Sequence, residues 1–204
     1  MSATAWSAYD EGYLRAWQWA SSLAGGAALP VVDAPIRLGP GEVAHMQLAR
    51  VALAGFFGEN VDARRSFLLF GGPVGLALTG AASIAHNERK RAEAERAAIP
   101  RWHDLGTADV VMTSQRLVVT AGGHVESFLY AESGPLEWAA GARGAPAVQL
   151  QPSGAPPLRL ASPWAALLFV LVHQLLDGRP PGVPLPAGLL ERARAEGRLA
   201  AQGT

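Results

Sequence analysis

The stretch from Gly106 to Leu176 decides the fold of this chain, because it contains several short strand-like runs followed by one apolar helix. The strand-like runs read GTADVVMT-SQ-RLVVTA-GG-HVESFLYAE-SGP-LEWAA and then AVQLQ-PSGAP-PLRLAS, and the helix reads PWAALLFVLVHQLL. Branched and aromatic residues favour strands, whereas Gly, Pro and Ser mark the turns between them. Short strands joined by tight turns and closed by a helix are typical of a small antiparallel barrel or open sandwich. The sequence therefore predicts an α+β fold that is mainly β.

Turn and capping signals set the boundaries within this stretch. Thr113–Arg116 has the composition of a hairpin connection, and Gly122-Gly123 is a strong turn signal before the next strand. The closing helix is expected to begin with Ser162 as N-cap and Pro163 as its first residue. Residues 164–172 carry no polar residue, so we expect this helix to be buried on most sides.

Clusters of Pro and Gly divide the rest of the chain. Aromatic side chains at helical spacing predict a helix over residues 5–24, ended by Gly25-Gly26, and the partial alternation of residues 43–51 predicts a strand within residues 42–57. A weak helix, mobile or loosely docked, is expected around residues 187–200. We expect three segments: residues 1–35 as N-terminal helix and linker, residues 36–178 as the main domain with a helical insertion at about 58–104, and residues 179–204 as Pro-rich linker and weak helix.

The expected insertion contains residues 67–85, which carry no charge. A single membrane span is one interpretation of this stretch. Against it, the apolar run after the Gly71-Gly72-Pro73 break reaches only about 20 Å as a helix, which is less than the roughly 30 Å of a hydrocarbon core. We favour a short strand, a turn, and a helix over residues 73–98 whose first half is apolar and whose second half is charged.

Composition excludes several classes of function. The chain has 204 residues, of which 50% are hydrophobic and 17% are charged, so one domain with a real core is expected. Its 17 basic and 17 acidic residues argue against a nucleic-acid partner. It has no cysteine, which excludes disulfides and thiol chemistry. The N-terminal residues lack the features of a signal peptide, so a cytoplasmic location is expected, or a peripheral one at the inner face of the membrane.

No catalytic motif stands out. The chain lacks a Gly-x-Ser-x-Gly elbow, a His-Glu-x-x-His pair and a phosphate-binding loop that ends in Gly-Lys-Ser/Thr. His124 and Glu126 share a strand face and are a candidate metal-binding pair, but a solvated strand face explains them better. His173 on the apolar helix is expected to be a hydrogen-bonded core or rim histidine. We therefore expect no enzyme activity, no cofactor and no metal.

Two short motifs resemble those of a known family. The sequence Met112-Thr113-Ser114-Gln115-Arg116-Leu117 is similar to the hairpin of bacterial PH-like and GRAM-like domains, and Leu38-Gly39-Pro40-Gly41-Glu42 resembles the motif that precedes their first strand. The resemblance covers about residues 36–177 without the insertion, and extends to small actinobacterial proteins with an inserted helix. It implies a bent seven-stranded antiparallel sandwich or open barrel, capped by a C-terminal helix, that recognises lipid, peptide or protein.

We accordingly expect a non-enzymatic interaction module that binds a protein partner or an anionic lipid surface. Arg116 is a candidate contact by the resemblance alone, and otherwise a turn residue that pairs locally. The other candidate contacts are basic residues of the insertion, which would seat its apolar half-helix on anionic lipid or on a partner: Arg64, Arg65, Arg89, Lys90 and Arg91. The alternatives are self-association into a homo-oligomer through the apolar inserted helix, and a membrane protein anchored by a single span.

Overall fold

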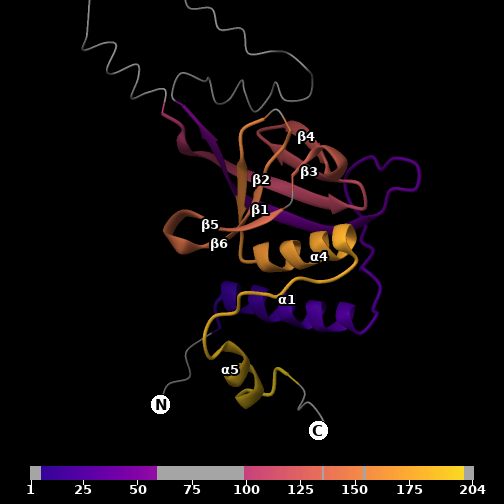
Figure 1. The fold of residues 1–204 in the computed structure, drawn as a ribbon, viewed down its shortest axis with the longest axis vertical. Coiled ribbons are helices and arrows are strands. Elements are labelled where there is room, and N and C mark those ends of the chain that lie inside the picture. Colours follow the sequence, from indigo (N-terminus) through magenta and orange to yellow (C-terminus); the bar gives the residue numbers. More distant parts are fainter. Residues whose placement is uncertain (1–5, 59–98, 135, 154, 200–204) are drawn as a thin grey trace, which may run out of the picture.

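A computed structural model describes residues 6–58, 99–134, 136–153 and 155–199 of the protein. Within this part of the chain, one seven-stranded antiparallel sheet has the order β4-β3-β2-β1-β7-β6-β5 (Figure 1). The strands are β1 (Ala44–Phe57), β2 (Arg101–Thr113), β3 (Arg116–Ala121), β4 (His124–Leu129), β5 (Glu137–Ala140), β6 (Pro146–Leu150) and β7 (Leu158–Ala161). The helices are α1 (Ala8–Ala24), α4 (Ala165–Asp177) and α5 (Leu189–Ala195). The expected α+β class with mainly β structure is confirmed.

Strand β1 joins the two halves of the sheet. It pairs with β2 over nearly its whole length, and its Ala52–Gly55 segment also pairs with β7. Its register against β2 shifts between Leu48 and Val51, where Arg50 has a φ of 57° and its backbone N–H donates to Oδ1 of Asp109 at 3.0 Å. A bulge of this kind bends a strand and increases its twist. The bend allows one long strand to serve both halves of a curled sheet.

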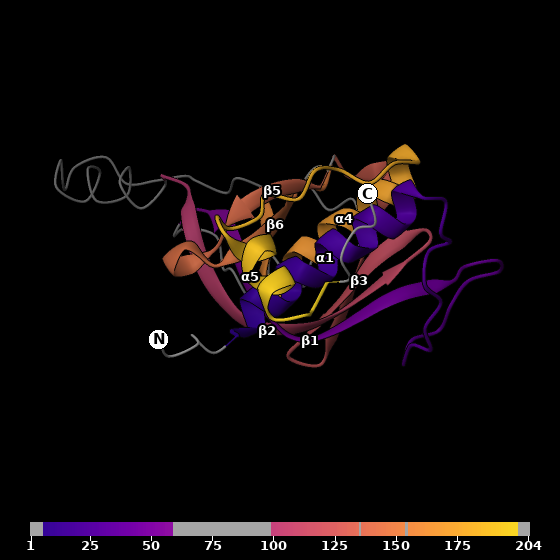
Figure 2. The same ribbon diagram turned by 90° about the horizontal axis from the view of Figure 1, so that it is seen from below.

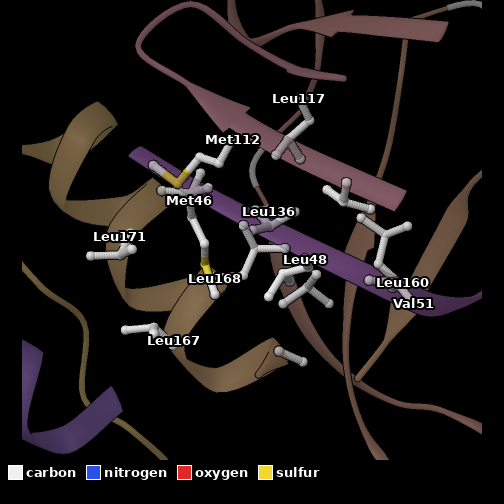
Figure 3. Packing of buried hydrophobic residues seen from close by; sticks show 14 of the residues in the cluster. Met46, Leu48, Val51, Met112, Leu117, Leu136, Leu160, Leu167, Leu168 and Leu171 are labelled. Carbon is white, nitrogen blue, oxygen red and sulfur yellow. The ribbon is translucent and has the colours of Figure 1, made fainter. Parts of the chain in front are cut away.

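The core lies on the inner face of this curled sheet (Figure 3). Side chains that point inward from β1, β2, β3 and β7 meet the apolar side chains of α4 there. The largest fully buried members include Leu53, Met112, Leu117, Leu160 and Leu168. Burying a side chain of this size contributes about 1.5–3 kcal/mol, so this cluster supplies the main driving force for folding.

Helix α4 is apolar on nearly all sides because it lies between two layers. The sheet packs on one side and α1 packs on the other (Figures 1 and 2). The prediction that residues 164–172 are buried on most sides is confirmed for most of them, while Trp164 and Phe169 remain partly exposed. The helix begins at Ala165, two residues later than predicted. Trp164 is the N-cap, so the prediction of Ser162 at this position was wrong, although the Ser162 Oγ accepts a hydrogen bond from the Trp164 N–H at 3.2 Å.

Helix α1 confirms the helix that was predicted within residues 5–24. A capping box between Ser7 and Asp10 caps its N-terminal end. Gly12 in the middle of the helix permits a close approach to α4. A Cβ atom at this position would lie 1.8 Å from the carbonyl oxygen of Pro163. An aromatic contact also joins α1 to β5, because the ring centroids of Tyr13 and Trp138 are 6.1 Å apart. Glycine is therefore required here in spite of its low helix propensity.

The linker before β1 is an extended strap on the outer face of the sheet. Its side chains Val32, Ala34, Ile36 and Leu38 pack on Ala44, Val111 and Val118. The Val32 N–H also donates to the Ala44 carbonyl oxygen at 2.9 Å. Alternate residues of the strap thus seal the outer face of the strands β1, β2 and β3.

The C-terminal helix is shorter than predicted. Instead of residues 187–200, α5 covers Leu189–Ala195, and its Leu189 and Ala193 are buried. Ion pairs attach it to α1: Arg192 lies 2.8 Å from Asp10, and Arg198, just beyond the helix, lies 2.7 Å from Glu11. These charges and two apolar side chains place the helix against α1, where the sequence predicted a weak helix that is mobile or loosely docked.

Strand β2 is longer than the sequence suggested, because it begins at Arg101 rather than at Gly106. The strand predicted over residues 42–57 is confirmed as β1, Ala44–Phe57. The pairing of Phe57 with Arg101 shows that the insertion expected at about 58–104 ends before β2 begins. The strand at residues 67–70, the helix at 73–98 and the alternative span at 67–85 lie outside the described residues.

The Gly12 contact can be tested by Gly12→Ala. In a solvated helix this change is stabilising by up to about 1 kcal/mol, because alanine is the better helix former. Here we expect a loss of about 1–3 kcal/mol in the free energy of unfolding, since the new methyl group must displace the Pro163 carbonyl. Urea denaturation measures the change, and Arg15→Ala on the exposed side of α1 is the control. A stabilised Gly12→Ala protein would contradict this packing of α1 on α4.

Candidate functional site

Of the candidate contact residues, the described part of the chain contains Arg116 alone. Arg64, Arg65, Arg89, Lys90 and Arg91 lie outside the described residues. Arg116 is the first residue of β3, at the end of the hairpin connection from β2. Its surroundings therefore show what one of the two family-like motifs does in this fold.

Arg116 is paired with Glu42, the last residue of the Leu38–Glu42 motif. The Arg116 Nε lies 2.9 Å from Glu42 Oε1, and Nη2 lies 3.1 Å from Oε2, so the pair is bidentate. Nη2 also donates to the Arg37 carbonyl oxygen at 3.2 Å, and Nη1 donates to Ser127 Oγ at 3.1 Å. The guanidinium thus connects the strap, the hairpin and β4. Bidentate pairs of this kind fix geometry as well as charge.

Glu42 is the buried centre of this arrangement, with only 2% of its side chain exposed. Oε1 also accepts a hydrogen bond from Thr113 Oγ1 at 2.6 Å, and Oε2 accepts one from the Gly39 N–H at 2.7 Å. Burial alone would raise the pKa of Glu42, but the hydrogen bonds from Arg116, Thr113 and Gly39, together with the charge of Arg116, lower the pKa to about 2. We call Glu42, Thr113 and Arg116 the carboxylate lock.

The lock gives Arg116 a structural role. Its Nε and Nη2 are directed at partners within the domain, and Thr113 Oγ1 in turn accepts the backbone N–H groups of Gln115 and Arg116. The two motifs that resemble the PH-like pattern are therefore in contact: the acid of one holds the threonine and arginine of the other. Arg116 is thus a strand residue whose main partner, Glu42, lies 74 positions earlier in the chain, and not a turn residue that pairs locally.

Tyr130 lies close to the lock and is the other strongly perturbed group among the described residues. Burial, and then the negative charge of Glu42, raise the pKa of its phenol far above the usual value. Its hydroxyl is buried and has no hydrogen-bond partner among the described residues. At neutral pH, Glu42 is ionised and Tyr130 is protonated. Neither group has a pKa near 7, where general acid–base catalysis is most effective.

The histidines of the described region have structural partners or are exposed. His173 lies 2.9 Å from the Leu136 carbonyl oxygen and 2.7 Å from Asp177, as expected of a hydrogen-bonded rim residue. His45 and His103 are within hydrogen-bond distance of backbone carbonyl oxygens. His124 is exposed on the edge strand. Among the residues described, no three His, Cys, Asp or Glu side chains gather where they could hold a metal ion.

An aromatic–cationic cluster at the far end of β1 and β2 was missed by the sequence analysis. The Arg159 guanidinium lies 3.8 Å from the ring centroid of Trp102, and Trp102 lies 5.3 Å from Phe56. Arg159 is held in place by Gln149 Oε1 at 3.1 Å. The partial alternation of polar and apolar residues in Arg101-Trp102-His103-Asp104-Leu105 could have predicted that β2 extends this far towards the N-terminus. We call Phe56, Trp102 and Arg159 the Trp102 cluster.

No family model, curated protein or solved structure matches the chain. None of the helices in the described ranges is long and apolar enough to cross a membrane.

The carboxylate lock can be tested by Glu42→Ala, which leaves Arg116 without its anion. Removing one partner of a buried pair costs about 3–5 kcal/mol, and partial exposure of Arg116 brings the expected loss to about 2–4 kcal/mol of unfolding free energy. Glu11→Ala is the control, because it breaks an exposed pair with Arg198 and is expected to cost at most about 1 kcal/mol. Equal losses for the two variants in urea denaturation would contradict a stabilising lock.

The lock also predicts an acid sensitivity. The pKa of Glu42 is about 2 in the folded protein against 4.5 for the ordinary group, so the unfolded chain binds more protons between these values. The stabilisation is complete above pH 4.5 and is lost as the pH falls through 2, with a total of about 3 kcal/mol from the difference in pKa. Glu42→Gln lacks this titration. We expect its unfolding free energy to fall less steeply than that of the natural protein over this range; superimposable slopes would refute the assignment.

Proposed function

We propose that this chain is a non-enzymatic PH-like interaction module that binds a protein partner. The observation that carries the proposal is the sheet order β4-β3-β2-β1-β7-β6-β5 with α4 packed on its inner face. The resemblance implied a bent seven-stranded sandwich or open barrel capped by a C-terminal helix, and seven antiparallel strands with one helix on their inner face are compatible with it. The contact between Glu42 and Arg116 supports it further, because it explains why the two motifs occur together.

The chemistry of the described residues favours binding over catalysis. A catalytic site needs a nucleophile, acid or base with a pKa matched to its task, placed within reach of a substrate. Among the described residues, the groups with the largest pKa shifts are Glu42, which belongs to the lock, and Tyr130, which is buried close to it, and both titrate far from neutrality. Both pKa shifts have a structural cause. Glu42 is bonded to the hairpin residues Thr113 and Arg116, and Tyr130 is buried close to Glu42.

The charge distribution favours a protein partner over an anionic membrane. Residues 6–58 and 99–199 contain 11 basic and 12 acidic residues, a net charge of 11 − 12 = −1. Residues 59–98 contain 6 basic and 5 acidic residues, a net charge of 6 − 5 = +1. Each basic residue near an anionic surface contributes about 1 kcal/mol, so a balanced chain gains little from such a surface. We place the module in the cytoplasm as part of the same proposal.

The Trp102 cluster is the best candidate for the contact region. It lies at the end of β1 and β2 to which residues 59–98, with the candidate contacts Arg64, Arg65, Arg89, Lys90 and Arg91, are joined. Aromatic residues and arginine are enriched at the centres of protein interfaces. The proposed partner therefore contacts the Trp102 cluster together with the adjoining segment.

Site-specific photo-crosslinking in the native cell tests this proposal. A photoreactive residue replaces Ile99, which is 62% exposed and precedes β2 by two residues, and Tyr9 on α1 serves as an exposed control. We expect a discrete protein adduct from position 99 and none from position 9, and loss of the adduct with Arg159→Ala. No adduct at position 99, or equal adducts at both positions, would overturn the proposed contact region.

Vesicle sedimentation separates the protein partner from the lipid surface. Full-length protein is mixed with neutral vesicles and with vesicles rich in phosphatidylserine, at low and at high salt. We expect no co-sedimentation under any of these conditions, because the charges balance. Binding to the anionic vesicles that is lost at high salt would instead favour the membrane interpretation, since screening weakens only the electrostatic contribution.

A further inference from the structure

Among the described residues, β4 is the last strand on its side of the sheet, and the hydrogen-bonding phase of its outer edge can be deduced. The Tyr130 N–H donates to the Gln115 carbonyl oxygen at 3.2 Å, in register with the pairing of Leu129 and Arg116. Hydrogen-bonded pairs alternate along an antiparallel ladder, so the even-numbered residues of β4 bond to β3. The backbone N–H and C=O groups of Val125, Ser127 and Leu129 therefore point away from β3.

The local contacts agree with this phase. The Leu129 carbonyl oxygen accepts a hydrogen bond from Ser133 Oγ at 2.9 Å, which is a partner outside the ladder. Among the described residues, the sheet order ends at β4, so no further strand covers this side. A row of outward backbone groups is the usual template for the addition of another strand.

The side chains of the same residues make this edge apolar. Val125 is 60% exposed and Leu129 is 40% exposed, and both project from the outer face of the sheet on either side of Ser127. The strap of Val32–Leu38 packs on the cluster of Ala44, Val111 and Val118, which includes neither of them. The outer apolar surface therefore extends past the strap to the free edge.

We propose that β4 pairs with β4 of a second copy of this chain, antiparallel, about a two-fold axis at Ser127. In this register the outward groups of the two Ser127 residues bond to each other, and Val125 of each copy bonds to Leu129 of the other. The Leu129 carbonyl oxygen accepts this bond with its second lone pair, beside the bond from Ser133 Oγ. Each exposed Val125 side chain then lies beside the partner copy's exposed leucine, on the same face. The sheet continues through both molecules, and the interface is the same patch on each copy, as a two-fold axis requires.

Self-pairing fits this edge better than pairing with an unrelated strand. The valine and the leucine lie at equal distances from Ser127, so a two-fold axis brings unlike, complementary side chains together without any change in the strand. An axis at Glu126 would instead place two carboxylates opposite each other, and like charges at such positions are destabilising. The inference uses only the free edge and its phase, so it goes beyond the proposed partner-binding function and does not depend on it.

Cysteine cross-linking tests both the dimer and its register in the full-length protein. The chain has no natural cysteine, so a single introduced thiol can link only to its copy. In a hydrogen-bonded pair the Cα atoms are about 5.5 Å apart, which suits a disulfide. Ser127→Cys is therefore expected to form a disulfide-linked dimer under mild oxidation. Val125→Cys, two residues from the axis, would place its thiols roughly 14 Å apart at 3.4 Å per residue and should not link.

Light scattering over a dilution series measures the association itself. We expect a dimer for the natural protein, a monomer for Val125→Lys, and a dimer for the control Val31→Lys, whose position is 74% exposed on the strap side of the chain. A charged residue on the edge discourages strand pairing without entering the core. A natural protein that is monomeric throughout, a Val125→Lys protein that still dimerises, or disulfide formation by Val125→Cys equal to that by Ser127→Cys would each overturn the proposal.

Neither result depends on the photo-crosslinking at Ile99. If the dimer is absent but the adduct at position 99 forms, the edge proposal fails and the partner-binding function stands. If the dimer forms and position 99 gives no adduct, the edge proposal stands and the proposed contact region fails.

Discussion

A buried carboxylate organises the end of this sheet. Glu42 accepts hydrogen bonds from a side chain and a backbone amide, and it pairs with Arg116 in the same small volume. An unpaired charge in that place would be costly, so the loop before β1, the β2–β3 connection and the first residue of β3 must assemble together. The position of the strap over the outer face follows, since Arg37 and Gly39 belong to the same network.

The second constraint is the shape of the sheet. Strand β1 must bend to pair with β2 along its length and with β7 at its end, and the bulge at Arg50 allows this. The curled sheet has an apolar inner face that another element of the chain must cover. Helix α4 fills it, and because α4 is apolar on its other side as well, α1 completes the layer stack. Gly12 sets the separation of these two helices.

The sequence predicted the fold class and most of the elements, because alternation and turn residues are local signals. It predicted β7 at Leu158–Ala161 and the helix α1, whose capping and periodicity lie within a few residues. Strand ends were harder: β2 begins at Arg101, and the residues that extend it are paired by β1, which is far away in the sequence.

In the site, too, single residues could be predicted from the local sequence, whereas contacts between distant residues could not. Glu42 and Arg116 were each singled out, but their contact spans 74 positions in the chain and is invisible to spacing. The docking of α5 likewise depends on Asp10 and Glu11 at the opposite end of the chain. Such contacts are set by tertiary packing, which composition and periodicity do not encode.

The docking of α5 has a topological consequence. The ring of Trp6 lies 4.2 Å from the Arg192 guanidinium and 4.3 Å from that of Arg198, so the first and last described turns of the chain touch. Segments that meet in this way can be joined by a short peptide while the chain is opened elsewhere. Circular permutation is therefore open to this fold, and the linear order of its strands can be rearranged without moving any of them in space.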